Sequence, residues 1–193
     1  RYYLQLEWRA LAKALQTADR AGERAAAADA LAFRAERYRR FPDARTDETA
    51  LELNEGLAEY TGVMVGNATP QARRQAALHD LQAHVGNASF VRSFAYATGP
   101  AYGLLLDDLA PGWRKHLDGT PADLGTRLRD AASIEVATGE AALAAAASRY
   151  EGASLRAAET AREEKRLAQL KLNRQRFVEG PVLTLDLAHM SVQ

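Results

Sequence analysis

Apolar residues near the start of the chain recur at helical spacing. Four of them stand at i, i+4, i+7 and i+11: Leu4, Trp8, Leu11 and Leu15. This stripe predicts a helix over residues 2–19. Gly22 is expected to end it, and a second helix is expected over residues 23–40, stopped by the turn sequence Phe41-Pro42-Asp43.

The helical pattern continues beyond this turn. A third helix is expected over residues 47–63, and Thr69 followed by Pro70 has the sequence of a capped start for a fourth. Ser89 is expected to cap a fifth helix, which is apolar on nearly every face and is interrupted at Gly99-Pro100. Because a helix that is apolar all round is buried all round, this fifth helix is predicted to be the central one.

The remaining helices are predicted from turn residues. Short helices are expected to start at Pro111 and at Thr120-Pro121, and one long helix is expected over residues 140–177. After it, residues 182–187 alternate between apolar and polar side chains with period two, which predicts a strand.

The predicted fold class is therefore mainly α, a bundle-like helical lobe with one C-terminal β-strand. The lobe is expected over residues 1–178, and residues 179–193 would carry the strand into a missing segment. A lone strand needs partners, so it would pair with another chain or with a sheet beyond Gln193. The chain begins inside a helical pattern at Arg1, so upstream residues are expected to be missing as well.

Charge and composition narrow the functional classes. The 25 basic residues equal the 25 acidic ones, so charge gives no support to nucleic-acid binding. There is no cysteine, which excludes disulfides and thiolate chemistry. No apolar run approaches the roughly 20 residues that a transmembrane helix needs. These observations leave two classes of function: enzymes that use no catalytic thiol, and helical interaction modules.

One segment of the third helix carries candidate chemistry. It reads Asn54-Glu55-Gly56-Leu57-Ala58-Glu59-Tyr60, and it resembles the Asn-Glu-Gly-x-Ala segment of the gluzincin metallopeptidases, a class that includes zinc aminopeptidases. The resemblance implies that Glu55 is the third protein ligand of a catalytic zinc ion. Glu59, one turn further on, would orient a ligand histidine. Gly56 in mid-helix would let two helices approach closely.

The other parts of a gluzincin site are not in this sequence. In that class two zinc ligands are the histidines of an HExxH helix, whose glutamate is the general base, and no HExxH occurs in the 193 residues. The four histidines stand downstream of Glu55: His79, His84, His116 and His189. The resemblance therefore implies that HExxH precedes Arg1 and that this chain alone is inactive.

Two tyrosines are candidates for catalysis. The segment from Phe94 to Gly103 is similar to the helix that follows the ligand helix in gluzincins, where a tyrosine often stabilises the oxyanion. Tyr96 or Tyr102 would have this role, and either is equally interpretable as a core residue with a satisfied hydroxyl. The implied reaction is hydrolysis of a peptide or protein substrate by metal-activated water.

A second hypothesis comes from the same helix. Four glutamates form one stripe at i, i+4, i+7 and i+11: Glu48, Glu52, Glu55 and Glu59. An ordinary surface helix would place such a stripe in solvent, and the chain would then be a non-catalytic helical interaction module whose terminal strand docks onto a partner. A degenerate peptidase that lost its metal lies between the two hypotheses. The oligomeric state stays open, and the resemblance leans towards an exported bacterial protein.

Overall fold

The computed structural model describes residues 1–117 and 122–181, and this part of the chain contains helices and no strand. The helices are α1 (Tyr2–Gln16), α2 (Arg20–Arg40), α3 (Ala44–Leu51), the π-helical turn η1 (Glu52–Gly56), α4 (Leu57–Gly66), α5 (Pro70–Ala83), α6 (Ser93–Leu109), the 3₁₀ turn η2 (Trp113–His116), α7 (Leu124–Ala131), α8 (Glu140–Arg149) and α9 (Gly152–Phe177). The mainly α fold class is confirmed. The predicted strand at 182–187 lies outside the described residues.

The chain divides into two compact units, Arg1–Ala153 and Ser154–Gln193. The first unit holds the helices from α1 to α8, and the described residues of the second are the greater part of α9. None of the helices in the described part of the chain is long and apolar enough to cross a membrane.

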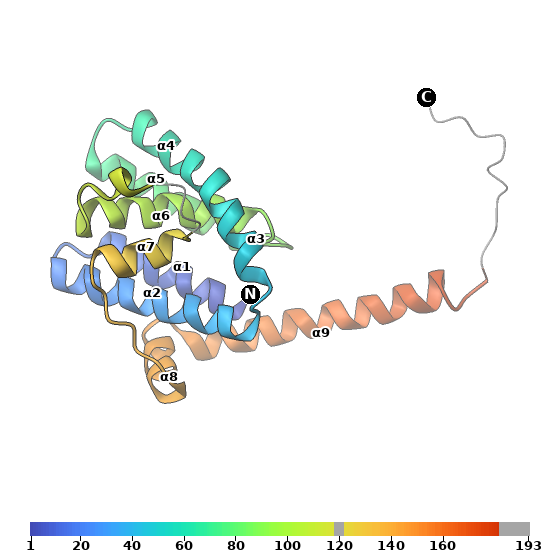
Figure 1. Ribbon diagram of the computed structural model, residues 1–193. Helices are drawn as coiled ribbons and strands as arrows, with labels where there is room; N and C mark the ends of the chain where they lie inside the picture. The colour runs from blue at the N-terminus through green and yellow to red at the C-terminus, as the bar shows by residue number, and fades with distance from the viewer. Residues whose placement is uncertain (118–121, 182–193) are drawn as a thin grey trace, which may run out of the picture. The chain divides into compact units, whose positions relative to one another are not determined.

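Helix α6 lies at the centre of the first unit. It packs against α1, α2, α4, α5 and α7, and Figure 1 shows it between the α1–α2 pair and α4 with α5. Its residues from Ala97 to Leu106 are all buried, which confirms the predicted central helix. The expected interruption at Gly99-Pro100 is wrong, because α6 continues through both residues. Tertiary packing on all sides stabilises the helix despite the missing N–H of the proline.

Helices α1 and α2 pack along each other, and the predicted stripe of α1 is buried. Leu4, Trp8, Leu11 and Leu15 are all buried. The expected break at Gly22 is wrong. The break falls at residues 17–19, and Gly22 lies in the first turn of α2, where its N–H donates to the Asp19 side chain at 2.7 Å. An aspartate cap satisfies a free N–H of the helix start and therefore fixes where α2 begins.

The third predicted helix is real but irregular. Helix α3, the π-helical turn η1 and α4 follow one another without a gap. A Cβ atom on Gly56 would lie 3.1 Å from the carbonyl oxygen of Ala95, and one on Gly99 would collide with the backbone of Gly56. These two glycines let η1 and α6 touch backbone to backbone, so Gly56 does permit a close helix approach.

Two other helix boundaries agree with the prediction from the sequence. Thr69 caps α5 as predicted, since its side chain accepts the N–H of Ala72 at 3.1 Å. The 3₁₀ turn η2 matches the short helix expected after Pro111.

Two other expected helix boundaries differ from the structure, and a third lies outside the described residues. Helix α6 starts at Ser93, one turn later than a cap at Ser89 would place it. The long helix expected over residues 140–177 is instead α8 and α9, separated at Tyr150-Glu151, where Glu151 has a left-handed φ of 54°. Thr120-Pro121 lie outside the described residues, and the helix beyond them, α7, is capped by Asp123.

Candidate functional site

The π-helical turn η1 presents Glu55 towards the first turn of α6. Glu55 is half-buried, and its Oε2 accepts the hydroxyl of Tyr96 at 2.6 Å. The close contact between Gly56 and Gly99 brings the two helices near enough for this bond. The structure thus joins the predicted ligand to one of the two predicted tyrosines, although 41 residues separate them in sequence.

The hydrogen bond fixes the protonation state of Tyr96. The bond to Glu55, followed by burial and the negative charge of Glu55, raises the pKa of Tyr96 above its ordinary value. The hydroxyl therefore stays protonated at neutral pH and remains a donor. An O–H···O⁻ bond of this length is among the stronger hydrogen bonds in proteins.

Further titratable groups surround this pair. The ring centre of His84, at the end of α5, lies 6.5 Å from that of Tyr96. Nδ1 of His84 lies 3.1 Å from the side-chain nitrogen Nδ2 of Asn87. Glu59, predicted to orient a ligand, is half-buried on α4. Burial, and next the negative charge of Glu59, raise the pKa of Asp80. Helices α4, α5 and α6 therefore meet in a patch of acidic, imidazole and phenol groups.

The patch fits part of a metal site. A zinc ion accepts carboxylate oxygen, and Glu55 offers one such donor on a packed helix. Within the described residues, however, no group of three histidine, aspartate or glutamate side chains lies close enough to hold a metal ion. The chain can supply one carboxylate ligand here, and further ligands would have to come from elsewhere.

The second predicted tyrosine lies elsewhere. Tyr102 is fully buried on another face of α6, and its hydroxyl donates to Glu7 at 2.9 Å. The guanidinium carbon of Arg34 lies 4.3 Å from the centre of its ring. Burial, followed by the negative charge of Glu7 and Glu52, raises the pKa of Tyr102 well above its ordinary value. Tyr102 is thus part of a different cluster from Glu55 and Tyr96.

That cluster is a buried ionic network centred on Arg34, which sequence inspection missed. Arg34 donates from Nε to Glu7 at 2.7 Å, from Nη2 and Nη1 to Glu52 at 2.6 and 2.9 Å, and from Nη1 to Asp123 at 2.9 Å. All four side chains are at most 3% exposed. The network joins α1, α2, η1 and the start of α7.

Two members of the network, Arg34 and Asp123, have pKa values shifted in favour of their charged forms. Burial works to lower the pKa of Arg34, but the carboxylates of Glu52 and Glu7 outweigh it and hold that pKa well above the ordinary value. Burial likewise works to raise the pKa of Asp123, but Arg34 and the hydrogen bonds from Thr126 bring it to about 2. Arg34 and Asp123 are therefore both charged at neutral pH, and their ion pair has a structural role.

A sequence signal for this network exists. Glu7 lies three residues after Leu4 and four before Leu11, on the apolar stripe of α1, and Arg34 lies three residues after Leu31 in the same way. Charged residues on an apolar stripe predict a buried ion pair, because an unpaired buried charge is costly. Periodicity alone could not have supplied the partners Glu52 and Asp123.

The buried arginines also bind two glutamates of the predicted acidic stripe. Glu52 is 1% exposed and bonds Arg34, the hydroxyl of Thr98 and the N–H of Leu124. Glu48 forms an ion pair with the buried Arg37. The expectation that the whole stripe faces solvent is wrong for these two glutamates.

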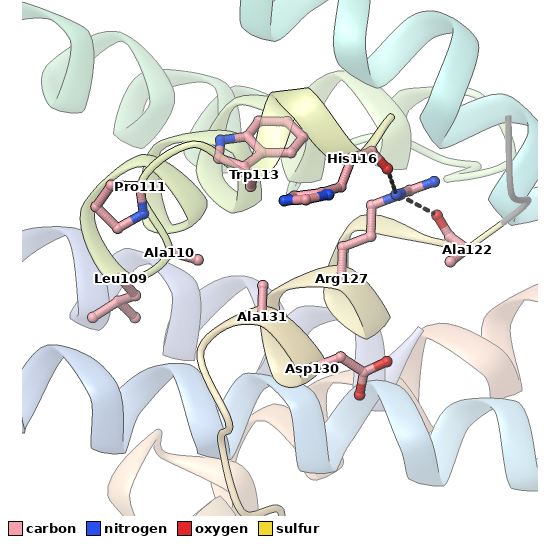
Figure 2. Close-up of a pocket in the computed structure, with 9 residues that line it drawn as sticks. All are labelled: Leu109, Ala110, Pro111, Trp113, His116, Ala122, Arg127, Asp130 and Ala131. Carbon is pink, nitrogen blue, oxygen red and sulfur yellow. Dashed lines mark hydrogen bonds between the residues drawn. The ribbon is translucent and has the colours of Figure 1, made fainter. Parts of the chain in front are cut away.

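A cavity of about 740 Å³ lies at the far end of α6. Figure 2 shows it between the Leu109–Trp113 segment and α7, with Arg127 donating to the backbone oxygens of His116 at 3.0 Å and Ala122 at 3.1 Å. Tyr96 lies 13 residues before Leu109 on the same helix, which corresponds to about 20 Å. The cavity is therefore separate from the patch around Glu55.

No protein-family model, curated protein or solved structure matches this chain.

Proposed function

We propose that this chain forms the helical part of a zinc-dependent peptidase and that Glu55 supplies one carboxylate ligand to the metal. The observation that carries the proposal is the 2.6 Å hydrogen bond from Tyr96 to Glu55. The gluzincin resemblance gives Glu55 the role of a ligand and names Tyr96 as one of two candidate tyrosines, and these two side chains meet at a partly exposed surface.

The irregular helix geometry supports the same residues. π-helical turns are rare and are frequent at functional sites, and Glu55 lies in one. Within this turn, Glu52 is buried against Arg34, whereas the carboxylate of Glu55 accepts the hydroxyl of Tyr96. A glutamate that supported only the fold would be expected to join the ionic network, as Glu52 does.

The roles of the chain's own side chains follow from their contacts. Glu55 offers an anionic oxygen ligand that Tyr96 holds in place. The Tyr96 hydroxyl has a single proton to donate, so it would stabilise negative charge on a substrate carbonyl oxygen only after giving up its bond to Glu55. Glu59, a half-buried carboxylate four residues after Glu55, would orient an imidazole ligand. The zinc ion, when bound, would lower the pKa of a water molecule and polarise the scissile carbonyl.

The first test is the coding sequence that precedes Arg1. An HExxH segment on a predicted helix there would supply the two histidines and the general base. The protein extended to include that segment would then be prepared with Glu55→Gln, which keeps the shape and removes the charge. Asp47→Asn, at an exposed carboxylate on the preceding helix, is the matched control.

Zinc content is measured by mass spectrometry. Peptide hydrolysis is measured with a mixed peptide library. We expect Glu55→Gln to lose both bound zinc and hydrolysis, while Asp47→Asn keeps both and circular dichroism shows both variants folded. Absence of the histidine pair upstream, or full zinc content in Glu55→Gln, contradicts the proposal. The non-catalytic helical module would then be the better account.

A further inference from the structure

A second hollow lies beside the ionic network, away from Glu55, and it has a volume of about 460 Å³. It is lined by residues of α2, the start of α3, α7 and the segment after α7: Leu31, Arg34, Ala35, Tyr38, Arg39, Pro42, Arg45, Asp123, Gly125, Thr126, Arg129, Val136 and Thr138. We call it the arginine groove. Its volume is within the range of small-molecule sites, about 300–1,000 Å³.

The rim of the groove carries three arginines from three different helices. Arg39 on α2 is 68% exposed, Arg45 on α3 is 57% exposed and Arg129 on α7 is 48% exposed. The side chains between them are largely apolar, including the ring of Tyr38 and Val136. The groove therefore combines an apolar body with guanidinium groups, a pattern suited to an amphipathic anion.

Arg39 donates from both Nε and Nη2 to Glu36, at 2.7 and 2.8 Å, but the other two rim arginines retain donor capacity. Arg129 donates from Nε to Asp130 at 2.7 Å, which leaves the outer edge of its guanidinium without a described carboxylate. The nearest described carboxylate oxygen to Arg45 belongs to Asp123, at 3.9 Å, which is beyond hydrogen-bond distance. The Asp123 carboxylate itself is held by Arg34 and Thr126. A ligand anion can therefore bond Arg45 and Arg129 without displacing an existing hydrogen bond.

We propose that the arginine groove binds a small organic acid, with its carboxylate on Arg45 and Arg129 and its apolar body against Tyr38 and Val136. A planar carboxylate matches the fork of a guanidinium group. Asp123 at the floor and the carboxylates of Glu36 and Asp130 beside the rim would repel a phosphate dianion more than a monoanion. The inference does not depend on the zinc proposal, since it uses none of the same residues.

The test uses the 193-residue chain and two probes, N-acetyl-leucine and N-acetyl-leucine amide, which differ in the carboxylate. Binding is followed by ligand-observed NMR and by calorimetry, with inorganic phosphate as a third probe. Arg45→Gln and Arg129→Gln each remove one rim charge. Ala35→Trp fills the groove from an exposed helical position without changing charge. Arg166→Gln is the matched control, because Arg166 is 49% exposed and bonds Glu163 much as Arg129 bonds Asp130.

We expect N-acetyl-leucine to bind and its amide to bind at least about tenfold more weakly, since one charge-assisted contact is worth about 1.4 kcal/mol or more. Each rim variant and Ala35→Trp should weaken binding by about tenfold, and Arg166→Gln should leave it unchanged. The proposal is overturned if the acid does not bind, if acid and amide bind equally, if phosphate binds more tightly than the acid, or if the groove variants behave like the control.

Discussion

Arg34→Met tests the buried ionic network, because methionine approximates the length of the side chain and removes its charge. Arg34 makes its four hydrogen bonds to Glu7, Glu52 and Asp123 at 2.6–2.9 Å. Charge-assisted bonds contribute about 1.5–3 kcal/mol each, but the carboxylates keep other donors, such as Tyr102 for Glu7. Removing one member of a buried ion pair costs about 3–5 kcal/mol, and we expect the unfolding free energy to fall by this amount.

The loss should depend on pH in a defined direction. In the native chain the pKa of Asp123 is lowered to about 2 from an ordinary value of 3.8, so its ionised form stabilises the fold above about pH 4. That contribution is lost as the pH falls towards 2. Without Arg34, burial dominates and raises the pKa of Asp123, so protonation favours the folded variant. The difference in stability between native chain and variant should therefore shrink as the pH falls from 7 to about 4.5.

The assay is urea unfolding followed by circular dichroism, with the fluorescence of Trp8 and Trp113 as a second probe. Arg166→Met is the control, because its ion pair with Glu163 is exposed and worth less than about 1 kcal/mol. A loss below about 1 kcal/mol for Arg34→Met, or an equal loss at both pH values, would refute the structural role assigned to the network.

Three further predictions concern single positions. Gly99→Ala places a methyl group against the backbone of Gly56 and should lower the free energy of unfolding in urea by about 1–3 kcal/mol. Gly62→Ala is the control, because a Cβ there meets nothing within 4 Å, and it should be neutral or slightly stabilising. Equal effects of the two substitutions would disprove the close helix contact. Thr69→Ala removes the cap of α5 and should cost about 1 kcal/mol by the same assay, and an unchanged stability would show that the cap bond contributes nothing. Tyr96→Phe should change stability by less than about 1 kcal/mol, because the hydroxyl lies at a partly exposed surface, but should lower kcat for peptide hydrolysis in the extended protein; an unchanged kcat would remove Tyr96 from the mechanism.

Local sequence signals predicted most of the helices. The stripe of α1, the Thr69-Pro70 start of α5 and the apolar α6 each follow from residues within a few turns of one another. The failures are local too. Gly22 was a weaker signal than the Asp19 cap, whereas Gly152, which directly follows the left-handed Glu151, was a signal for the separation of α8 from α9 that the predicted single helix overlooked.

The candidate site depends on contacts that periodicity cannot supply. The partners of Arg34 lie 18, 27 and 89 residues away, and they come from three separate elements. The spacing of the glutamates was compatible with a surface stripe, and only the packing of α2 shows that Glu52 is buried. The pairing of Glu55 with Tyr96 likewise required the fold, because the motif indicated Glu55 and the sequence left Tyr96 and Tyr102 as alternatives.

The π-helical turn at Glu52–Gly56 makes two contacts that anchor the rotation of the helix about its axis. At the first residue of the turn, the bond of Glu52 to Arg34 is one anchor. At its last residue, the contact of Gly56 with Gly99 is the other. An α-helix turns about 100° per residue, so deleting one residue here would leave only one of the two anchors in register. The chain therefore tolerates substitution at the exposed Asn54 far better than its deletion, and a change in length of this segment would move Glu55 off its surface.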